Sequence, residues 1–458
     1  MNPILKIKCL RILFQVFLLI SLSIIFSCFF DDNDDDDGST IEDNEPLNDI
    51  ERVSFAFDRS ETDGDSWACS ISSDGRFVAF YSDATNIVHS DTNELGDIFV
   101  FDRETGINER VSIASDGSQA NDEPFTCSLS SNGRFVAFGS YATNLVPNDT
   151  NDAVDVFVHD REKGITERVS VASDGSQANG DSYWVALNFD GHVVAFMSEA
   201  TNLVVGDANN SSDIFLHDRK LRITKRVSVA SDGTEANDES IFARLSSNGR
   251  YVAFLSNASN LVPNDPNGFV ADCFVHDHQI HDTELIYESA AYVEPGGGTF
   301  LSSPSLSPDG RFVGFDSWSE DLVPGDTNKS PDAFLIDRET GNIERCSVSS
   351  DGSEADYGSN TPEISADNRF VVFGSAATNL VPNDLNGYTD VFVKHRETGQ
   401  IERVSITFNG SDGDDVSFAP HISLDGKYIA FSSYSENLVE NDSNGYMDVF
   451  IVSNPINQ

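Results

Sequence analysis

Basic residues are scarce in this chain of 458 residues: 28 Lys and Arg stand against 76 Asp and Glu, a formal net charge of −48. A folded surface with this balance repels phosphates, which excludes nucleic-acid binding and argues against contact with an anionic membrane surface. Cysteine is scarce too, and six Cys in this length exclude a disulfide scaffold. The chain is nevertheless no disordered polyacid, because 39% hydrophobic residues and 33 Phe exceed what disorder tolerates.

Motifs of several enzyme classes are also absent. The sequence contains no Gly-x-Ser-x-Gly elbow, no His-Glu-x-x-His pair and no phosphate-binding loop. Carboxylate pairs are so abundant that choosing two of them as a glycosidase dyad would be arbitrary. We therefore assign no catalytic residue, and the sequence leans towards a protein that is not an enzyme.

Residues 1–27 are predicted to form a signal peptide, with a basic start and an apolar stretch over residues 12–26. Its end, Ile25-Phe26-Ser27-Cys28, resembles the lipobox of bacterial lipoproteins. The resemblance implies cleavage before Cys28, acylation of its thiol, and export to the cell envelope, at the outer membrane or cell surface. The membrane would then be contacted through the lipid anchor only. An ordinary signal peptide, or an uncleaved anchor, is the alternative.

An acidic tether is predicted over residues 28–49. It contains the run Asp31-Asp32-Asn33-Asp34-Asp35-Asp36-Asp37. Like charges at this density keep a chain extended and solvated, so the segment would hold the folded part away from a membrane.

One unit is repeated seven times over residues 50–458. The string Arg-Val-Ser, or a variant of it, recurs every 58 to 60 residues, beginning at Arg52, Arg110, Arg168, Arg226, Leu285, Arg345 and Arg403. Units of this length stacked side by side indicate a repeat architecture and leave no room for a further domain.

Each unit is predicted to contain four short strands, which we name a to d in chain order. In the unit that starts at Pro124 they cover residues 125–130, 134–140, 155–160 and 167–172. Strands b and c are nearly continuous apolar runs, which is typical of strands buried on both faces. No sustained 3.6-residue period follows residue 28, so the fold class is all-β. Seven such units predict a seven-bladed β-propeller with four antiparallel strands per blade.

The two ends of the chain predict how the ring closes. The last unit stops after its strand c, at residues 448–452, and the first unit is preceded by an extra strand d at residues 51–57. We expect the N-terminal strand to fill the gap in the last blade. A solenoid would need terminal caps instead.

The segment from Ser305 to Phe315, with its Ser-Pro-Asp-Gly-Arg turn, resembles the blade motif of TolB-like, WD-repeat-like bacterial propellers. The turns at Ser73-Asp74-Gly75-Arg76 and Leu424-Asp425-Gly426-Lys427 match as well. The resemblance covers residues 50–458 and implies the propeller fold. TolB carries an additional N-terminal domain and fewer blades, so its role in envelope integrity is not carried over.

The b–c and d–a loops share one face of such a ring, and this face is predicted to be strongly acidic. Only Arg59 and Lys329 are basic there, because we place the Arg-Val-Ser arginines at the start of strand d, on the other face. Each b–c loop carries Asp-x-Asn-x-x-x-Asp, with one extra residue in the fourth. The residues are Asp91, Asn93, Asp97, Asp149, Asn151, Asp155, Asp207, Asn209, Asp213, Asp265, Asn267, Asp272, Asp326, Asn328, Asp332, Asp384, Asn386, Asp390, Asp442, Asn444 and Asp448.

These oxygen-rich loops suggest calcium, the only cofactor considered, because Ca²⁺ needs several oxygen ligands on a flexible loop. They resemble the calcium loops of other propeller-type repeats, which usually carry an additional Asp-Gly. The alternative is loop shaping, since Asp and Asn cap turns and a shaping residue would recur in every unit.

Other polar and divergent positions carry less information. The d–a loops, such as residues 116–122, are expected near the central channel.

His159, His217 and His276 are interpreted as packing residues. Four cysteines are interpreted as small buried hydrophobes without obvious pairs: Cys69, Cys127, Cys273 and Cys346. The fifth unit is the most divergent, with Glu288, Tyr292 and Glu294 in place of the usual linker, and is where a unique site would be sought.

The sequence thus favours an exported, lipid-anchored, non-catalytic binding or scaffold propeller. Its partner would be a protein or a glycan on the acidic face. The alternative is a propeller-type hydrolase or lyase with its site at the channel mouth. A third interpretation is an envelope scaffold whose acidity reflects a salty habitat.

Overall fold

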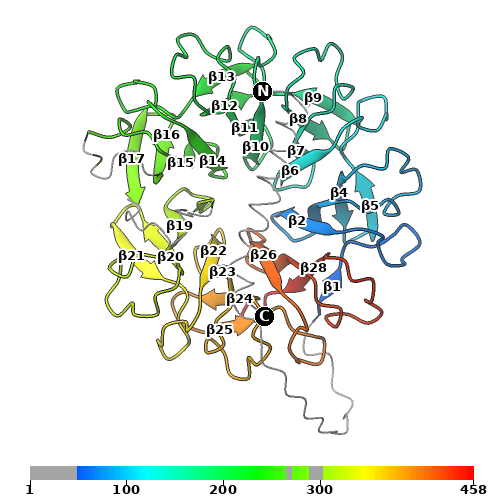
Figure 1. Cartoon of the computed structure of the whole chain (residues 1–458), viewed down its shortest axis with the longest axis vertical. Coiled ribbons are helices and arrows are strands. Elements are labelled where there is room, and N and C mark those ends of the chain that lie inside the picture. Colours follow the sequence, from blue (N-terminus) through cyan, green and yellow to red (C-terminus); the bar gives the residue numbers. More distant parts are fainter. Residues whose placement is uncertain (1–48, 264, 266–270, 288–302, 458) are drawn as a thin grey trace.

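A computed structural model describes residues 49–263, 265, 271–287 and 303–457. In this part of the chain every regular element is a strand, and the 28 strands form seven four-stranded antiparallel sheets. The sheets stand around a common axis (Figure 1). The predicted seven-bladed β-propeller is therefore confirmed. No helix long and apolar enough to cross a membrane occurs among these residues.

The inner strands of blades 1 to 7 are β2 (Ser66–Ile71), β6 (Pro124–Leu129), β10 (Ser182–Leu187), β14 (Ser240–Leu245), β18 (Ser305–Leu306), β22 (Ser359–Ile364) and β26 (Ser417–Ile422). The second strands are β3 (Phe77–Ser82), β7 (Phe135–Ser140), β11 (Val193–Ser198), β15 (Tyr251–Ser256), β19 (Phe312–Ser317), β23 (Phe370–Ser375) and β27 (Tyr428–Ser433).

The third strands are β4 (Asp97–Asp102), β8 (Asp155–Asp160), β12 (Asp213–Asp218), β16 (Asp272–Asp277), β20 (Asp332–Asp337), β24 (Asp390–His395) and β28 (Asp448–Ser453). The outer strands are β5 (Ile107–Arg110), β9 (Ile165–Arg168), β13 (Ile223–Arg226), β17 (Asp282–Tyr287), β21 (Asn342–Arg345), β25 (Ile401–Arg403) and, for blade 7, β1 (Glu51–Arg52).

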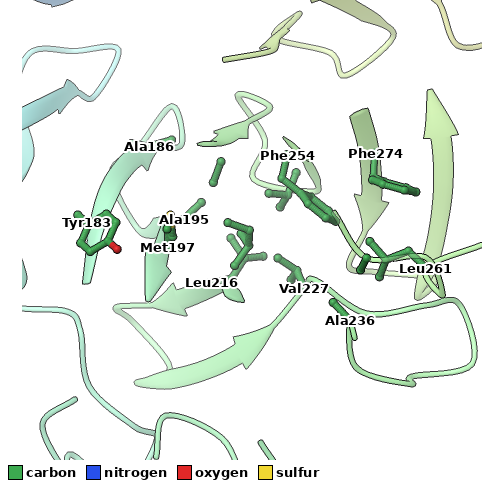
Figure 2. Packing of buried hydrophobic residues seen from close by; sticks show 14 of the residues in the cluster. Tyr183, Ala186, Ala195, Met197, Leu216, Val227, Ala236, Phe254, Leu261 and Phe274 are labelled. Atoms are coloured by element: carbon green, nitrogen blue, oxygen red, sulfur yellow. The ribbon is translucent and has the colours of Figure 1, made fainter. Parts of the chain in front are cut away.

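The core lies between neighbouring blades, because the two middle strands of a blade are covered on both faces. In blade 2, Phe138 of β7 pairs in register with Phe157 of β8, and their ring centroids are 5.8 Å apart. Between blades 3 and 4, Leu216 and Met197 meet Phe254 in one cluster (Figure 2). This two-sided burial explains why these strands are apolar throughout rather than alternating.

The tight turns between inner and second strands need glycine. Gly133 has φ +72°, and a Cβ added there would collide with the ring of Phe77 in the preceding blade. The Asn132 side chain caps the same turn by accepting a hydrogen bond from Ser130 Oγ at 2.9 Å. The positive φ of the turn and the packing against the preceding blade therefore both require glycine at position 133.

The ring closes where the sequence predicts. Glu51 and Arg52 of β1 pair antiparallel with Ile451 and Phe450 of β28, so the last blade is completed by the first strand (Figure 1). The Val53 amide continues this contact by donating to the Val449 carbonyl at 2.8 Å. The predictions for residues 1–27, Cys28, Asn267, Glu288, Tyr292 and Glu294 lie outside the described residues.

Candidate functional site

The Arg-Val-Ser arginines lie with the acidic loops, contrary to the sequence prediction. Each described outer strand that carries such an arginine ends at it rather than starting there; β9, for example, covers Ile165–Arg168 where residues 167–172 were predicted. The strand therefore delivers the guanidinium to the end of the blade where the b–c loop runs. These arginines therefore neutralise part of the negative charge on the face that was predicted to hold almost only carboxylates.

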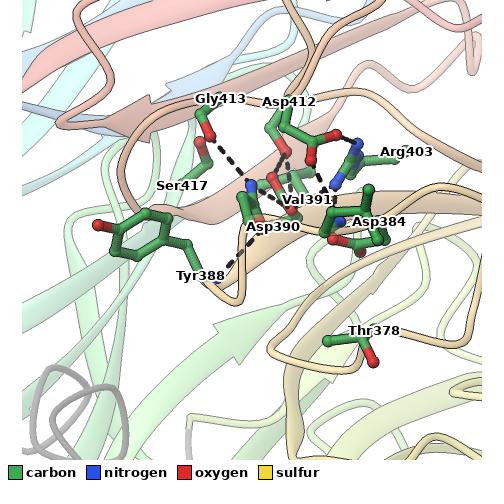
Figure 3. A network of polar contacts seen from close by, with 12 residues as sticks. Thr378, Asp384, Tyr388, Asp390, Val391, Arg403, Asp412, Gly413 and Ser417 are labelled. Carbon is green, nitrogen blue, oxygen red and sulfur yellow. Dashed lines mark hydrogen bonds and ion pairs between the residues drawn. The ribbon is translucent and has the colours of Figure 1, made fainter. Parts of the chain in front are cut away.

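Blade 6 shows the arrangement (Figure 3). Arg403 Nη1 lies 2.7 Å from Asp384 Oδ1 and 2.9 Å from Asp390 Oδ2. The other oxygen of Asp390 accepts a hydrogen bond of 2.5 Å from Ser405, the serine of the same Arg-Val-Ser string. Both ends of the string thus bind the loop.

Five further blades repeat this arrangement, with N–O distances of 2.8 to 3.4 Å. The sets are Arg110 with Asp91 and Asp97, Arg168 with Asp149 and Asp155, Arg226 with Asp207 and Asp213, Arg345 with Asp326 and Asp332, and Arg52 with Asp442 and Asp448. We call each set of one arginine and two aspartates an arginine clasp. In blade 4 the corresponding residue is Leu285, and the loop is described only in part.

The loop asparagines bind backbone. Asn386 Nδ2 donates to the Gly413 carbonyl at 3.1 Å and to Asp390 Oδ2 at 3.1 Å. Equivalent bonds to the following d–a loop come from Asn93, Asn151, Asn209, Asn328 and Asn444. The asparagine therefore joins the two loops of its face.

These contacts account for the loop aspartates without a metal ion. In the six clasps, a guanidinium already stands where both carboxylates converge, and the asparagine amide nitrogen faces backbone oxygen. Among the described residues no group of three or more His, Cys, Asp or Glu is placed to hold a metal ion. The contacts are those expected of loop shaping, and calcium binding stays a prediction.

Calcium is expected to leave the stability of the protein unchanged, because in the clasps it would have to displace an arginine held by two carboxylates. Melting curves recorded with millimolar calcium and with a chelator should superimpose. A higher melting temperature with calcium, together with heat in a calorimetric titration, would establish calcium binding.

One positive charge does not fully compensate two buried carboxylates. Burial, followed by the charge of Asp390, raises the pKa of Asp384 to about 7. In blade 7, burial and then Asp448 raise the pKa of Asp442 to about 7. Asp207 and Asp326 are raised to about 6 for the same reasons. In these four clasps the loop aspartate therefore has a pKa well above its usual value.

The d–a loops lie against the b–c loops of their face. Asn121 Nδ2 donates to Thr143 Oγ1 at 3.0 Å, and Asn144 Nδ2 donates to the Gln119 carbonyl at 2.8 Å. Asp116 caps its own turn by accepting from the Ser118 amide at 2.9 Å. These polar residues shape the loops, as do the equivalent residues of the next two d–a loops.

The predicted packing histidines are confirmed. His159, His217 and His276 are buried, and the Nδ1 atom of each lies 2.8 to 2.9 Å from a threonine hydroxyl of the adjacent outer strand. Burial lowers the pKa of all three imidazoles. Cys127, Cys273 and Cys346 are buried as predicted, whereas Cys69 is partly exposed.

A different position breaks the sevenfold repeat. We call it the axial position: the fifth residue of each full inner strand, and Ser305 of the short β18, which all pair with the third residue of the second strand. Four blades carry small residues there: Ser70, Ser128, Ala186 and Ser305. Blades 4, 6 and 7 carry Arg244, Glu363 and His421.

The axial position joins neighbouring inner strands. Ser128 Oγ accepts from the Leu187 amide of the next blade at 3.0 Å, and Ser305 Oγ donates to the Pro362 carbonyl at 2.5 Å. In blades 6 and 7 a charged pair takes this role, since His421 Nδ1 lies 2.9 Å from Glu363 Oε2. Both side chains of this pair are partly exposed.

Arg244 completes the axial group. Burial lowers the pKa of its guanidinium, and the charge of Glu363 opposes that effect. An arginine stays protonated under such conditions, so its positive charge lies within electrostatic range of Glu363. Phe242 lies two residues before Arg244 on β14, and its ring meets Trp184 of the neighbouring inner strand β10 edge to face, with centroids 4.8 Å apart.

The inner strands are also bent at a repeated place. Their third residues have positive φ in five blades, although none is glycine: Thr126, Trp184, Phe242, Thr361 and Ala419, at 43° to 57°. Each coincides with a register shift against the second strand. A bulge of this kind re-aims the side chains that follow it, including the axial residue.

The sequence contains a signal for this group. Counting back from each Gly-Arg or equivalent turn aligns Arg244, Glu363 and His421 with four Ser or Ala residues. An aligned column with three ionisable side chains breaks the repeat more sharply than the fifth unit's linker.

Comparison of the sequence with models of known families and with curated proteins finds no match. Among solved structures, an oligogalacturonate lyase in complex with manganese matches with a TM-score of 0.52 and 13% identity, covering 91% of this chain and 95% of that one. The oligogalacturonate lyase of Vibrio parahaemolyticus matches with a TM-score of 0.51 and 12% identity, covering 89% and 96%. A putative TolB of Agrobacterium tumefaciens matches with a TM-score of 0.41 and 16% identity, covering 78% and 98%.

At these identities the comparisons show the fold alone. TolB-like propellers are among the structural neighbours. The manganese ion and the oligogalacturonate substrate belong to those proteins.

Proposed function

We propose that this chain is an exported, lipid-anchored propeller that binds an acidic saccharide at the axial position without transforming it. The observation that carries the proposal is the break of the repeat at Arg244, Glu363 and His421. Serine or alanine satisfies the fold there in four blades, and ionisable groups near a protein interior cost stability unless they are paired or used. Export and the anchor rest on residues 1–28 of the sequence.

The chemistry of the axial group favours an acidic sugar. A guanidinium recognises a carboxylate through two parallel hydrogen bonds, and the imidazole of His421 can bind a hydroxyl through Nε2. Trp184, which is partly exposed and packs against the buried ring of Phe242, offers apolar surface on the inner strand β10, as sugar rings require. Two proteins of similar fold are named for oligogalacturonate, a saccharide with one carboxylate per residue.

Substitution Arg244→Ala is expected to weaken binding of a short galacturonate oligomer by roughly 10- to 100-fold, the loss expected for a hydrogen bond to a charged group. Isothermal titration of the full chain with this oligomer, and with a neutral galactose oligomer of the same length, measures the effect. Ser70→Ala, at the axial position of blade 1, is the matched control and should bind as the unaltered protein does. Equal affinity for both oligomers, or no effect of Arg244→Ala, would contradict the proposal.

The second candidate is a lyase acting at the same place, favoured by the contact between Glu363 and His421. The carboxylate orients the imidazole through Nδ1, which leaves Nε2 to take a proton. In an elimination, Nε2 of His421 would take the proton from the ring carbon that bears the carboxylate. The electron pair of that C–H bond would form a carbon–carbon double bond to the next ring carbon. The glycosidic oxygen on that next carbon would leave with its bonding pair and take a proton from solvent. Arg244 would neutralise the carboxylate.

The titration samples distinguish the two candidates. Ultraviolet absorbance reports the new double bond, and turnover that disappears in His421→Ala would establish the lyase. Binding without any rise in absorbance is the result expected for the binding protein.

A further inference from the structure

Two cysteines occupy matching places in the first two blades. Cys69 of β2 and Cys127 of β6 are each the fourth residue of an inner strand, and these strands are neighbours around the axis (Figure 1). Cys69 packs against the hydrophobic cluster that contains Cys127. Cys273 and Cys346 belong to two other clusters, in blades 4 and 5.

The two strands present these thiols differently. In β2 the register shift falls between Ala68 and Ser70, so Cys69 is the unpaired residue of the bulge. In β6 the shift falls between Phe125 and Cys127, and Cys127 stays paired with Phe138. A bulge frees a side chain from the regular alternation of a strand. Cys69 is therefore partly exposed, whereas Cys127 is 8% exposed.

The thiols also differ in reactivity. Burial, and then the neighbouring Cys69 thiol, raise the pKa of Cys127 well above its usual value. The thiolate is the nucleophile in disulfide exchange, and access to the oxidant limits its attack. Cys69 is accordingly the thiol that reacts first with an oxidant. The buried Cys127 thiol reacts second, with the Cys69 sulfur.

We propose that Cys69 and Cys127 form a disulfide that joins blades 1 and 2 when the protein meets a disulfide oxidant. The Cys69 thiolate attacks one sulfur of the oxidant and releases the first thiolate from it, which leaves a mixed disulfide on Cys69. The Cys127 thiolate then attacks the Cys69 sulfur and releases the second. The protein loses two hydrogen atoms and two electrons, and the oxidant becomes two thiols.

This disulfide would join blade 1 to blade 2, and blade 1 lies next to blade 7, in which the ring closes. Blade 1 contacts blade 7, whose outer strand is supplied by residues 51–52. A cross-link from blade 1 to blade 2 restricts the unfolded chain over about one repeat and so favours the closed ring. It goes beyond saccharide binding and does not depend on it.

The test is oxidation of the reduced full chain with oxidised glutathione, followed by proteolysis and mass spectrometry. We expect a peptide that links Cys69 to Cys127, no glutathione left on either residue, and a higher melting temperature that a reductant reverses. In Cys127→Ser, glutathione should remain on Cys69. In the double variant Cys273→Ser/Cys346→Ser, the cross-link should form as before.

Two results would overturn the proposal. One is glutathione that remains on Cys69 of the unaltered protein without a cross-link, which would show that Cys127 does not reach it. The other is a Cys69 thiol that takes up no glutathione even in Cys127→Ser, since the first step requires that thiol to be accessible.

Discussion

Replacement of residues 50–56 by a glycine–serine segment is expected to destabilise the protein by about 5–10 kcal/mol, enough to unfold an ordinary domain. The segment supplies strand β1, and Val53 and Phe55 are buried in the cluster between blades 7 and 1. It also supplies the arginine clasp of blade 7, in which Arg52 Nη1 lies 3.1 Å from Asp448 Oδ2. Without the segment, β28 becomes an exposed edge and the ring is open.

Thermal melting and limited proteolysis measure this effect, and cleavage should begin in blade 7. The matched controls are Arg52→Ala and Arg110→Ala, which each remove one clasp and should each cost about 3–5 kcal/mol, because a buried carboxylate pair loses its counter-ion. Arg110 lies within blade 1 and has no part in closure. If the replaced segment costs no more than Arg110→Ala does, the closure contributes nothing beyond its clasp, and the ring would be held by the blades alone.

The second large effect is that of acid: lowering the pH from about 7 to about 4 is expected to increase the free energy of unfolding. The pKa of Asp384 and of Asp442 is about 7 in the folded protein, because burial, followed by the neighbouring aspartate, raises it, against 3.8 for an unperturbed aspartate. Between these values the folded state binds more protons than the unfolded state does. The free energy of unfolding therefore falls as the pH rises through this window, and rises as the pH is lowered. The net charge of −48 acts in the same direction, since acid relieves self-repulsion.

The gain should end near pH 4. Asp337, whose pKa the hydrogen bond from Arg311 lowers to about 2, loses its stabilising charge below that point. Stability should then decline as the pH approaches 2. Urea unfolding at a series of pH values gives the profile.

Asp384→Asn and Asp442→Asn serve as controls for the pH profile, because an amide imitates the protonated acid. Each should raise stability at pH 7 and flatten the slope between pH 4 and pH 7. A free energy of unfolding that grows with pH over this range would show that the clasp carboxylates stay ionised and are fully compensated by arginine.

Much of the architecture follows from short-range signals. The predicted strand at residues 155–160 matches β8 residue for residue, and the Asn132-Gly133 turn lies in the predicted gap between residues 130 and 134, which separates β6 from β7. The missing last strand and the extra first one were enough to predict closure. These features are local in the chain, or repeated in every unit, so seven copies reinforce one weak pattern.

The ends of the outer strands could not be read in the same way. Arg168 ends β9, although the predicted strand began one residue before it. Val-Ser-Val-Ala after the arginine is as strand-like in composition as Ile-Thr before it, so propensity does not choose between them. A shift of a few residues moved six arginines to the opposite face and made the carboxylate loops look like sites for an external cation.

What the sequence by itself determined is the repeat, the all-β class, the closed ring and the excess of negative charge, because each is written in the pattern of a single unit or in the composition. Only the tertiary structure decided which charges meet. Asp384 lies in the loop before β24 and Arg403 at the end of β25, and Glu363 and His421 are a whole repeat apart, so their contacts depend on register and on the curvature of the ring. No local sequence pattern encodes the distances between side chains of different blades. The function proposed for this protein depends on those distances.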